Sequence, residues 1–301
     1  MLPINKLTLS DIEVPLTAQN LSIVVNVWGK DDPISLKRSL MSIEGQETKA
    51  RKLIIVVDGP INSVLEGLIE KFVDGANQVI RIPTASGLWN ARNVGIVAAG
   101  TEFVALHDAD DVMHPMRLTL QLKEAVESQA DIVVSPVYEF DAASEQIIGL
   151  RALCDNSNLI RKMRWHNVIN HSSVLLRRSA VLDLGGYRDI YLAEDYDLWI
   201  RMIEANKRFS CTPQVLQAFA VDSELTKRRG GRKFIASELA INRSISKTME
   251  LNQLVKSIRL IIRVVYRLSP RVVRKIHRTI FQTMKQSVHS SLTDFLISDL
   301  S

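Results

Sequence analysis

Short apolar runs alternate with segments of helical pattern through the first half of this 301-residue chain, and this alternation constrains the fold more than any other feature. The apolar runs are LSIVVNVWG, KLIIVVDG, QVIRIP and EFVALHDADD. The helical segments between and after them are DDPISLKRSLMSI, SVLEGLIEKFV, GLWNARNVGIVAAG and PMRLTLQLKEAVES. Continuous runs rich in β-branched residues are typical of strands covered on both faces. The sequence therefore predicts an α/β fold, a mostly parallel sheet with helices on both faces.

The pattern changes in the second half of the chain. DIVVSPVYEFD predicts one more strand, and HSSVLLRRSAVLDLGGY predicts a strand that turns into a helix ending at Gly185 and Gly186. EDYDLWIRMIEAN predicts a helix, and further helices are expected after the basic segment LTKRRGGRKF.

Acidic residues stand where two of the predicted strands end. Asp58 closes one strand, and Asp108, Asp110 and Asp111 follow another. Ligands of such sheets bind beyond the carboxyl ends of the strands. Three carboxylates within four positions repel one another, so a fold that gathers them usually supplies a cation such as Mg²⁺ or Mn²⁺. For Asp111, capping of the helix that starts near Pro115 is an open alternative to a role in the metal site.

A second acidic group opens the segment EDYDLWIR. Glu194 and Asp195 stand at the start of the predicted helix, where carboxylates suit the helix dipole. A carboxylate facing a pocket from this position can act as general base toward a substrate hydroxyl. Simple N-capping is the alternative. Asp197 and Arg201, four residues apart, are expected to form a surface ion pair.

Composition restricts the class of protein further. The two cysteines, Cys154 and Cys211, provide neither a disulfide framework nor metal-ligand spacing, which favours a reducing cytoplasm. No stretch of about 18 residues is free of charge, so a transmembrane helix is not expected. With 46% hydrophobic and 24% charged residues, the chain is typical of a globular enzyme.

Six segments, in this order, resemble a family 2 glycosyltransferase of the GT-A fold, similar to bacterial enzymes that build extracellular, capsular or O-antigen polysaccharides. The segments are LSIVVNVW, LIIVVDG, GLWNARNVG, FVALHDADDVMHPMRL, INHSSVLLRRSAVLDLGGYRD and EDYDLWIRM. The resemblance implies a Rossmann-like GT-A domain at residues 20–232, preceded by an extension (1–19) and followed by a basic helical extension (233–301).

The resemblance also implies an inverting transfer of a sugar from a nucleotide diphosphate sugar, with Mn²⁺ or Mg²⁺ bridging the diphosphate. Asp108 and Asp110 match the family's DXD motif, in which the first acid contacts the nucleotide and the second the metal. Asp58, Arg92 and Asn93 match positions near the nucleoside and diphosphate. The family commonly has two acids where Asp58 stands alone, which leaves its contact open.

Glu194 and Asp195 match the pair that supplies the catalytic base, and Asp195 is favoured. Trp28 and Arg229 are further candidates for the nucleotide-sugar site, with packing as the alternative for the tryptophan and a solvated basic loop as that for the arginine.

The resemblance implies an acceptor-side wall at WHNVINHSS, and a structural histidine and a core tryptophan are the alternatives for this segment. Trp165 and His171 suit sugar stacking and hydrogen bonding, and Trp199 is a third candidate that core packing would explain as well. His107 is expected to be a core histidine rather than a pocket group.

The tail is basic. Nine Lys or Arg residues and no Asp or Glu lie between Lys256 and Lys285, and Arg259, Arg263, Arg267 and Arg271 follow a four-residue spacing. A cationic amphipathic helix predicts binding to an anionic membrane surface. Packing on the catalytic domain is the first alternative, and nucleic-acid binding is the less favoured one.

The sequence thus predicts a metal-dependent enzyme that transfers a hexose, with UDP as the favoured donor nucleotide and a saccharide or lipid-linked acceptor. We expect it at the cytoplasmic membrane face as a peripheral protein that binds no nucleic acid. A degenerate nucleotide- or lipid-binding scaffold and a Mg²⁺-dependent Asp phosphotransferase are the alternatives.

Overall fold

The structure is a computed structural model, and it describes residues 20–151, 156–221, 233–248, 250–268 and 291–298. The expected N-terminal extension and the three separate segments that contain Cys154, Arg229 and Arg271 lie outside these described residues.

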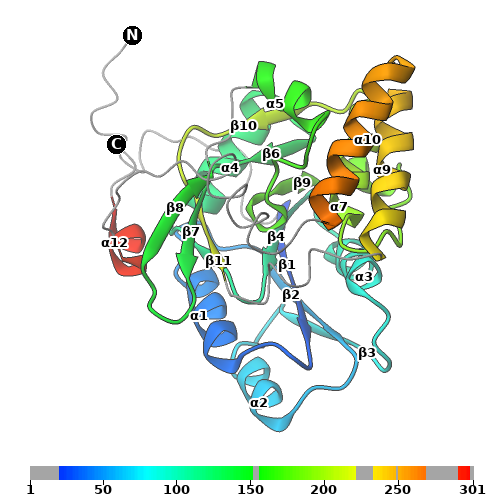
Figure 1. Cartoon of the computed structure of the whole chain (residues 1–301). Helices are drawn as coiled ribbons and strands as arrows, with labels where there is room; N and C mark the ends of the chain where they lie inside the picture. The colour runs from blue at the N-terminus through cyan, green and yellow to red at the C-terminus, as the bar shows by residue number, and fades with distance from the viewer. Residues whose placement is uncertain (1–19, 152–155, 222–232, 249, 269–290, 299–301) are drawn as a thin grey trace.

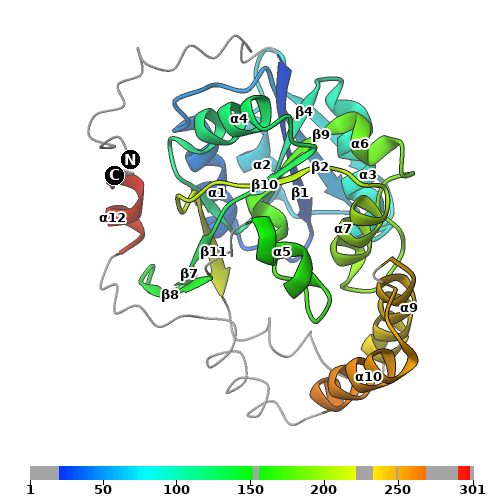
Figure 2. The same cartoon turned by 90° about the horizontal axis from the view of Figure 1, so that it is seen from above.

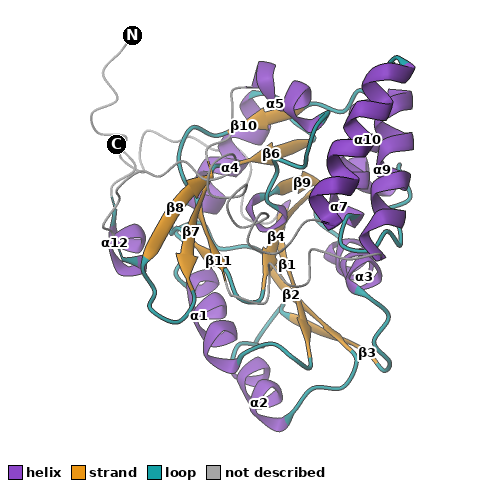
Figure 3. Cartoon of the chain, viewed as in Figure 1, coloured by secondary structure: helices purple, strands orange, loops and turns teal. Residues whose placement is uncertain are grey.

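A seven-stranded sheet forms the centre of the molecule, with the strand order β10-β6-β9-β4-β1-β2-β3 (Figures 1 and 3). Its strands are β1 (Leu21–Trp28), β2 (Lys52–Asp58), β3 (Gln78–Ile82), β4 (Phe103–Asp108), β6 (Ile132–Val134), β9 (Leu175–Arg177) and β10 (Phe209–Cys211). All neighbouring strands run parallel except β9, which is antiparallel to β4 and β6. The predicted mostly parallel sheet is confirmed.

Helices cover both faces of this sheet, because alternate residues of each strand are buried on opposite sides. On one face, Val25 and Ile55 belong to a core that includes residues of α1 (Pro33–Glu44), α2 (Ser63–Lys71) and α4 (Arg117–Glu127). On the other face, Val24 and Ile54 belong to a core with α3 (Leu88–Ala99), α6 (Arg178–Leu182) and α7 (Glu194–Glu204). Figure 2 shows the sheet between these two groups of helices.

The expected strand DIVVSPVYEFD is two strands in two sheets, which corrects the sequence prediction. β6 ends at Val134, and β7 (Val137–Asp141) begins after Pro136 in a four-stranded sheet of order β5-β11-β7-β8. Proline lacks the N–H that a continuous ladder requires, so the chain leaves the first sheet here. The other strands of this sheet are β5 (Val112–Met113), β8 (Ile147–Arg151) and β11 (Gln217–Val221).

Three further helices follow in the C-terminal part. α9 (Lys233–Thr248) packs on α7, and α10 (Gln253–Leu268) packs on α9 at the outer edge of the molecule (Figure 1). The short α12 (Leu292–Ile297) packs on the second sheet. Within the described part of the chain, no helix has both the length and the apolar character needed to cross a bilayer.

Candidate active site

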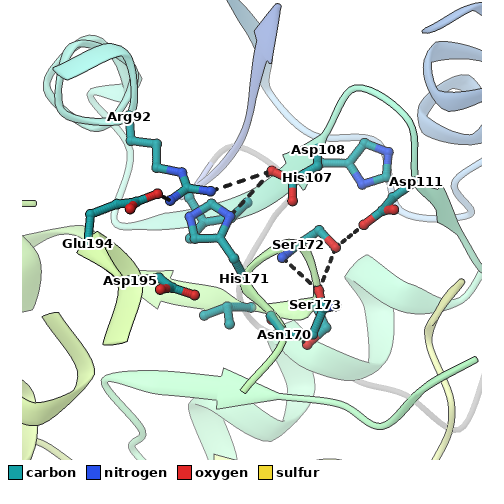
Figure 4. A network of polar contacts seen from close by, with 12 residues as sticks. Arg92, His107, Asp108, Asp111, Asn170, His171, Ser172, Ser173, Glu194 and Asp195 are labelled. Atoms are coloured by element: carbon teal, nitrogen blue, oxygen red, sulfur yellow. Dashed lines mark hydrogen bonds and ion pairs between the residues drawn. The ribbon is translucent and has the colours of Figure 1, made fainter. Parts of the chain in front are cut away.

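Strand register brings the acidic strand ends together. Trp28 of β1 is paired with Asp58 of β2, and Asn26 of β1 is paired with Asp108 of β4. Both carboxylates therefore stand at the carboxyl edge of the same sheet, as the sequence predicts. The N-terminus of α7, which carries Glu194 and Asp195, faces the same region (Figure 4).

Arg92 of α3 links the two acidic groups. Its side chain is buried, and its guanidinium lies 2.6 Å from Glu194 Oε1 and 3.8 Å from Asp108 Oδ1. Burial would lower the pKa of Arg92, but Glu194 and then Asp108 raise it above its ordinary value, so the group stays charged. Burial also raises the pKa of Glu194, against the opposing effect of Arg92. Glu194 is therefore occupied by an ion pair rather than open to a substrate.

His171 contacts Asp108 from the other side. It belongs to the turn η3 (His171–Ser173), and its Nδ1 lies 3.4 Å from Asp108 Oδ1 while its Nε2 lies 3.1 Å from the Tyr187 hydroxyl. Burial, followed by the charge of Arg92, lowers the pKa of His171, so the ring is neutral near pH 7. Burial would raise the pKa of Asp108, but His171 and Arg92 hold it well below its usual range. Asp108 is therefore a permanent carboxylate.

Trp199 supports His171 from within the core. The two rings stack with centroids 6.4 Å apart, and Trp199 is fully buried. The structure thus gives Trp199 the packing role that the sequence left open, because a buried ring presents no face to a sugar. Trp165 differs, since 41% of it is exposed.

Asp195 is only partly buried, unlike Glu194 beside it. Its Oδ2 accepts a hydrogen bond of 2.9 Å from Asn167 Nδ2, and its Oδ1 accepts one of 2.7 Å from the backbone N–H of Tyr196. Both bonds orient the carboxylate at the first turn of α7. The guanidinium of Arg92 contacts Glu194 instead. Asp195 is therefore the acid suited to accept a proton.

A fourth acid, Asp31, joins the cluster, and the sequence analysis missed it. It follows β1, and its Oδ2 accepts a hydrogen bond of 2.9 Å from the backbone N–H of Trp28. Burial raises its pKa to about 7, and the charges of Asp110 and Asp108 add to that effect. The next residue, Asp32, caps α1 by accepting from Ser35 N. In the sequence, Asp31 has no signal that separates it from this cap.

The residues present fit a divalent cation. Asp110 is exposed, and Asp108 beside it is partly buried. The charges of both acids raise the pKa of Asp31, and a bound cation would relieve this repulsion. Among the described residues, no three His, Cys, Asp or Glu side chains are arranged to hold an ion. In proteins, Mg²⁺ and Mn²⁺ are usually held by one or two carboxylates and completed by phosphate oxygens and water.

Asp111 has a role that neither alternative anticipated. It is fully buried and accepts hydrogen bonds from the hydroxyl of Ser172 and, at 2.8 Å, from the backbone N–H of Ala220. Burial raises its pKa well above the ordinary value, with repulsion from Asp110 and Asp108 acting in the same sense. α4 begins after Met116 with no side-chain cap. Asp111 therefore ties the acidic loop to η3 and β11.

The other nucleotide-side candidates have structural partners. Asp58 accepts from the backbone N–H groups of Ser86 and Gly87, at 2.7 and 3.0 Å, and so shapes the loop before α3. Asn93 exchanges two hydrogen bonds with the backbone of Tyr187. Trp28 is 42% exposed at the sheet edge, and Lys30 Nζ lies over its ring, 5.5 Å from the centroid.

His107 is buried beneath the site, in line with the sequence prediction. Its Nδ1 lies 3.2 Å from Gln217 Nε2, and Gln217 Oε1 accepts from Arg117 at 2.6 Å. Burial and the nearby Arg117 lower the pKa of His107 to about 3. The expected ion pair of Asp197 with Arg201 forms, at 2.7 Å, but it is buried and not on the surface. Arg201 also donates to Leu184 O and Gly186 O, which explains its burial.

Sequence comparisons relate the chain to known proteins. The family model described as Glycosyl transferase family 2 matches residues 22–185. Over 226 residues the chain is 28% identical to the amylovoran biosynthesis glycosyltransferase AmsE of Erwinia amylovora, covering 74% of this chain and 84% of that protein. It is 27% identical to a UDP-Gal:alpha-D-GlcNAc-diphosphoundecaprenol beta-1,3-galactosyltransferase of Escherichia coli, covering 72% and 80%.

Solved structures share the fold. S. aureus TarS, crystallised with UDP-GlcNAc, superposes with a TM-score of 0.59 at 16% identity, covering 87% of this chain and 73% of that one. The mannosyltransferase PcManGT of Pyrobaculum calidifontis, in complex with GDP-Man and Mn²⁺, gives 0.54 at 12% identity, covering 86% and 84%. The expected GT-A architecture is thereby confirmed.

Proposed function

The chain belongs to the Glycosyl transferase family 2, and from this premise we propose that it builds bacterial surface polysaccharide by inverting transfer of a hexose from a nucleotide diphosphate sugar. The acceptor is the hydroxyl of a saccharide or of a lipid-linked saccharide. The observation that carries this proposal is the pair of separate acidic groups at one sheet edge, Asp108 with Asp110 on one side and Asp195 on the other.

The donor side is formed by Asp108 and Asp110, with Asp58, Arg92, Asn93 and Trp28 around them. UDP is the proposed nucleotide, because the named donor of the E. coli relative is UDP-Gal and TarS is seen with UDP-GlcNAc. Asp110 and Asp108 would hold Mn²⁺ or Mg²⁺. When bound, the cation supplies positive charge that stabilises the departing nucleoside diphosphate. Arg92 contributes by keeping Asp108 ionised and fixed in place.

The acceptor side is formed by Asp195, and the exposed Trp165 is the ring proposed to stack on a sugar. His171, which is buried against Asp108 and Trp199, supports the site from beneath instead of facing the acceptor. Departure of the nucleotide leaves positive charge on the anomeric carbon, and the acceptor hydroxyl attacks from the opposite face. Asp195 accepts the proton of that hydroxyl as general base. The hydrogen bond from Asn167 holds the carboxylate toward the acceptor, while Glu194 serves as counter-ion to Arg92.

A lipid-linked acceptor places the enzyme at the cytoplasmic face of the membrane as a peripheral protein. The name of the E. coli relative, to which this chain is 27% identical, specifies a diphosphoundecaprenol acceptor, which supports this choice.

A donor panel tests the proposal. Purified enzyme is incubated with Mn²⁺ or Mg²⁺, a saccharide-diphosphate-lipid acceptor and each of several UDP-, GDP- and dTDP-sugars, and the release of nucleoside diphosphate is measured. We expect release from a UDP-hexose that needs both the metal and the acceptor. Tight binding of nucleotide without release from any donor would instead favour the scaffold alternative.

A further inference from the structure

Helix α10 turns its apolar side outward. Five residues of this face are 41–69% exposed; they are Leu254, Ile258, Ile261, Ile262 and Val265. Their spacing of four, three, one and three positions places them within an arc of about 100° along about 16 Å of helix. A surface helix of a globular protein normally buries such a stripe, so this orientation requires an explanation.

The arginines of the same helix point inward. Arg259 is fully buried, and it donates to Arg164 O at 2.7 Å and to Asn242 Oδ1 at 2.8 Å. Arg263 lies 2.7 Å from Glu238 of α9, a carboxylate that is itself buried. The arginine stripe that predicted contact with anionic lipid is therefore, at these two positions, what attaches α10 to the catalytic domain.

Helix α10 is attached to the elements that carry the acceptor side of the site. Arg259 holds the carbonyl of Arg164, the residue before the exposed Trp165. α9 joins α10 to α7, the helix whose first turn carries Asp195. Figures 1 and 2 show α9 and α10 side by side at one edge of the molecule, and Figure 2 shows them projecting from its body.

The surrounding charge selects the occupant. No Asp or Glu occurs from Leu251 to Thr293, whereas Lys256 and six further basic residues beyond the two buried arginines lie within that stretch. Two copies meeting through this face would bring like charges together. An anionic membrane offers both the opposite charge at its surface and apolar chains beneath it.

We propose that the exposed apolar face of α10 inserts into the interface of an anionic membrane and presents the acceptor side of the enzyme to the bilayer. The proposal deepens the function proposed above, on whose lipid-linked acceptor it rests. In this proposal, α10 binds the membrane through inserted Leu, Ile and Val side chains and not through a row of arginines. Basic residues that do not take part in the contact of α10 with the rest of the protein add attraction to the lipid headgroups.

Vesicle flotation tests this surface in the absence of donor and acceptor. The full-length protein is mixed with vesicles of phosphatidylglycerol and phosphatidylcholine, and the bound fraction gives a partition coefficient. We expect Ile261→Ser/Ile262→Ser to lower that coefficient about tenfold, because two inserted side chains lose their apolar surface. The matched control is Ile34→Ser/Met41→Ser on α1, whose side chains are 73% and 54% exposed and which should leave binding unchanged.

Equal binding by wild type and the α10 variant would overturn the proposal, as would an equal loss in the α1 control. Light scattering on the same samples detects the rival occupant: a wild-type dimer that the α10 variant converts to monomer, without vesicle binding, would assign the face to a second copy. Transfer to a short saccharide acceptor in detergent-free buffer is measured separately. Its absence would refute the proposed function while leaving the flotation result intact.

Discussion

Two buried arginines, Arg92 of α3 and Arg259 of α10, perform different tasks in regions that look equally polar in the sequence. Arg92 is surrounded by carboxylates, Glu194 at 2.6 Å and Asp108 at 3.8 Å. Arg259 is surrounded by neutral acceptors, the carbonyl of Arg164 and the side-chain oxygen of Asn242. The first balances the charge of a reactive centre, and the second fastens a helix whose outer face is apolar.

A charge pattern in the sequence therefore does not show which side of a helix faces the solvent. The partner of each arginine decides it, because a guanidinium that finds good acceptors is stable in the interior. The charged groups at the strand edge belong to the candidate active site, where charge changes during the proposed reaction. The charged groups at the contact of α10 stay paired. Mutations in each region test this difference between the strand edge and the contact of α10.

Replacing the proposed general base, Asp195, should give the largest difference in activity between the two regions. Asp195→Asn removes the proton acceptor and keeps the shape of the side chain, with one oxygen left for the two donors Asn167 and Tyr196 N–H, so the turnover number should fall about a thousandfold, or about 4 kcal/mol. Turnover is measured at saturating donor and acceptor. The matched control is Glu238→Gln, which alters the buried carboxylate that pairs with Arg263 and should keep most of the rate per folded molecule. Comparable losses in both variants would remove the distinction.

Removing each arginine should destabilise the protein to different degrees. Arg92→Met leaves Glu194 and Asp108 without their counter-ion and should lower the free energy of unfolding by about 3 to 5 kcal/mol. Arg259→Met leaves only neutral acceptors unpaired and should cost about 1 to 3 kcal/mol. Urea unfolding at pH 7 measures both.

A second variant checks the cause of the larger loss. Adding Glu194→Gln to Arg92→Met should recover part of the stability, because the uncompensated carboxylate is removed. If Arg259→Met costs as much as Arg92→Met, the partners of the two arginines do not explain the difference.

The histidine beneath the strand edge predicts a pH dependence. The pKa of His107 is lowered from 6.5 to about 3 by burial, so between these values the unfolded state binds a proton that the folded state does not. The stability that the neutral His107 contributes is therefore fully present above pH 6.5 and is lost as the pH falls. From pH 7 to pH 5 this loss amounts to about 2 kcal/mol. In His107→Gln the difference between urea unfolding at the two pH values should be smaller by that amount, and an unchanged difference would refute the assignment.

Much of the fold was predictable, because burial on both faces leaves a visible pattern of β-branched runs. The strands β1, β2 and β4, and the positions of Asp58 and Asp108 at their ends, follow directly from that pattern. The split at Pro136 was missed, since VVSPVYEF keeps its apolar character across the break. Only pairing with distant strands, such as β11, shows that the chain has changed sheet.

The candidate site was predictable where a motif repeats a local arrangement, as for Asp108 and Asp110. Asp31, the ion pair of Arg92 with Glu194 and the link from Asp111 to Ser172 were not, because each depends on residues more than 50 positions apart or on burial that has no sequence signal. The outward apolar face of α10 was missed for the same reason: the helix pattern shows two faces, but tertiary contacts decide which one is covered.

Calorimetric titration of UDP in the presence of Mn²⁺ tests most directly that the two acidic groups divide the work. The account predicts that wild type and Asp195→Asn bind UDP with similar affinity and that both lose this binding when the metal is chelated. Asp110→Asn should lose the metal-dependent part of the affinity. Binding to Asp110→Asn that equals wild type, with the same response to the metal, would contradict the account.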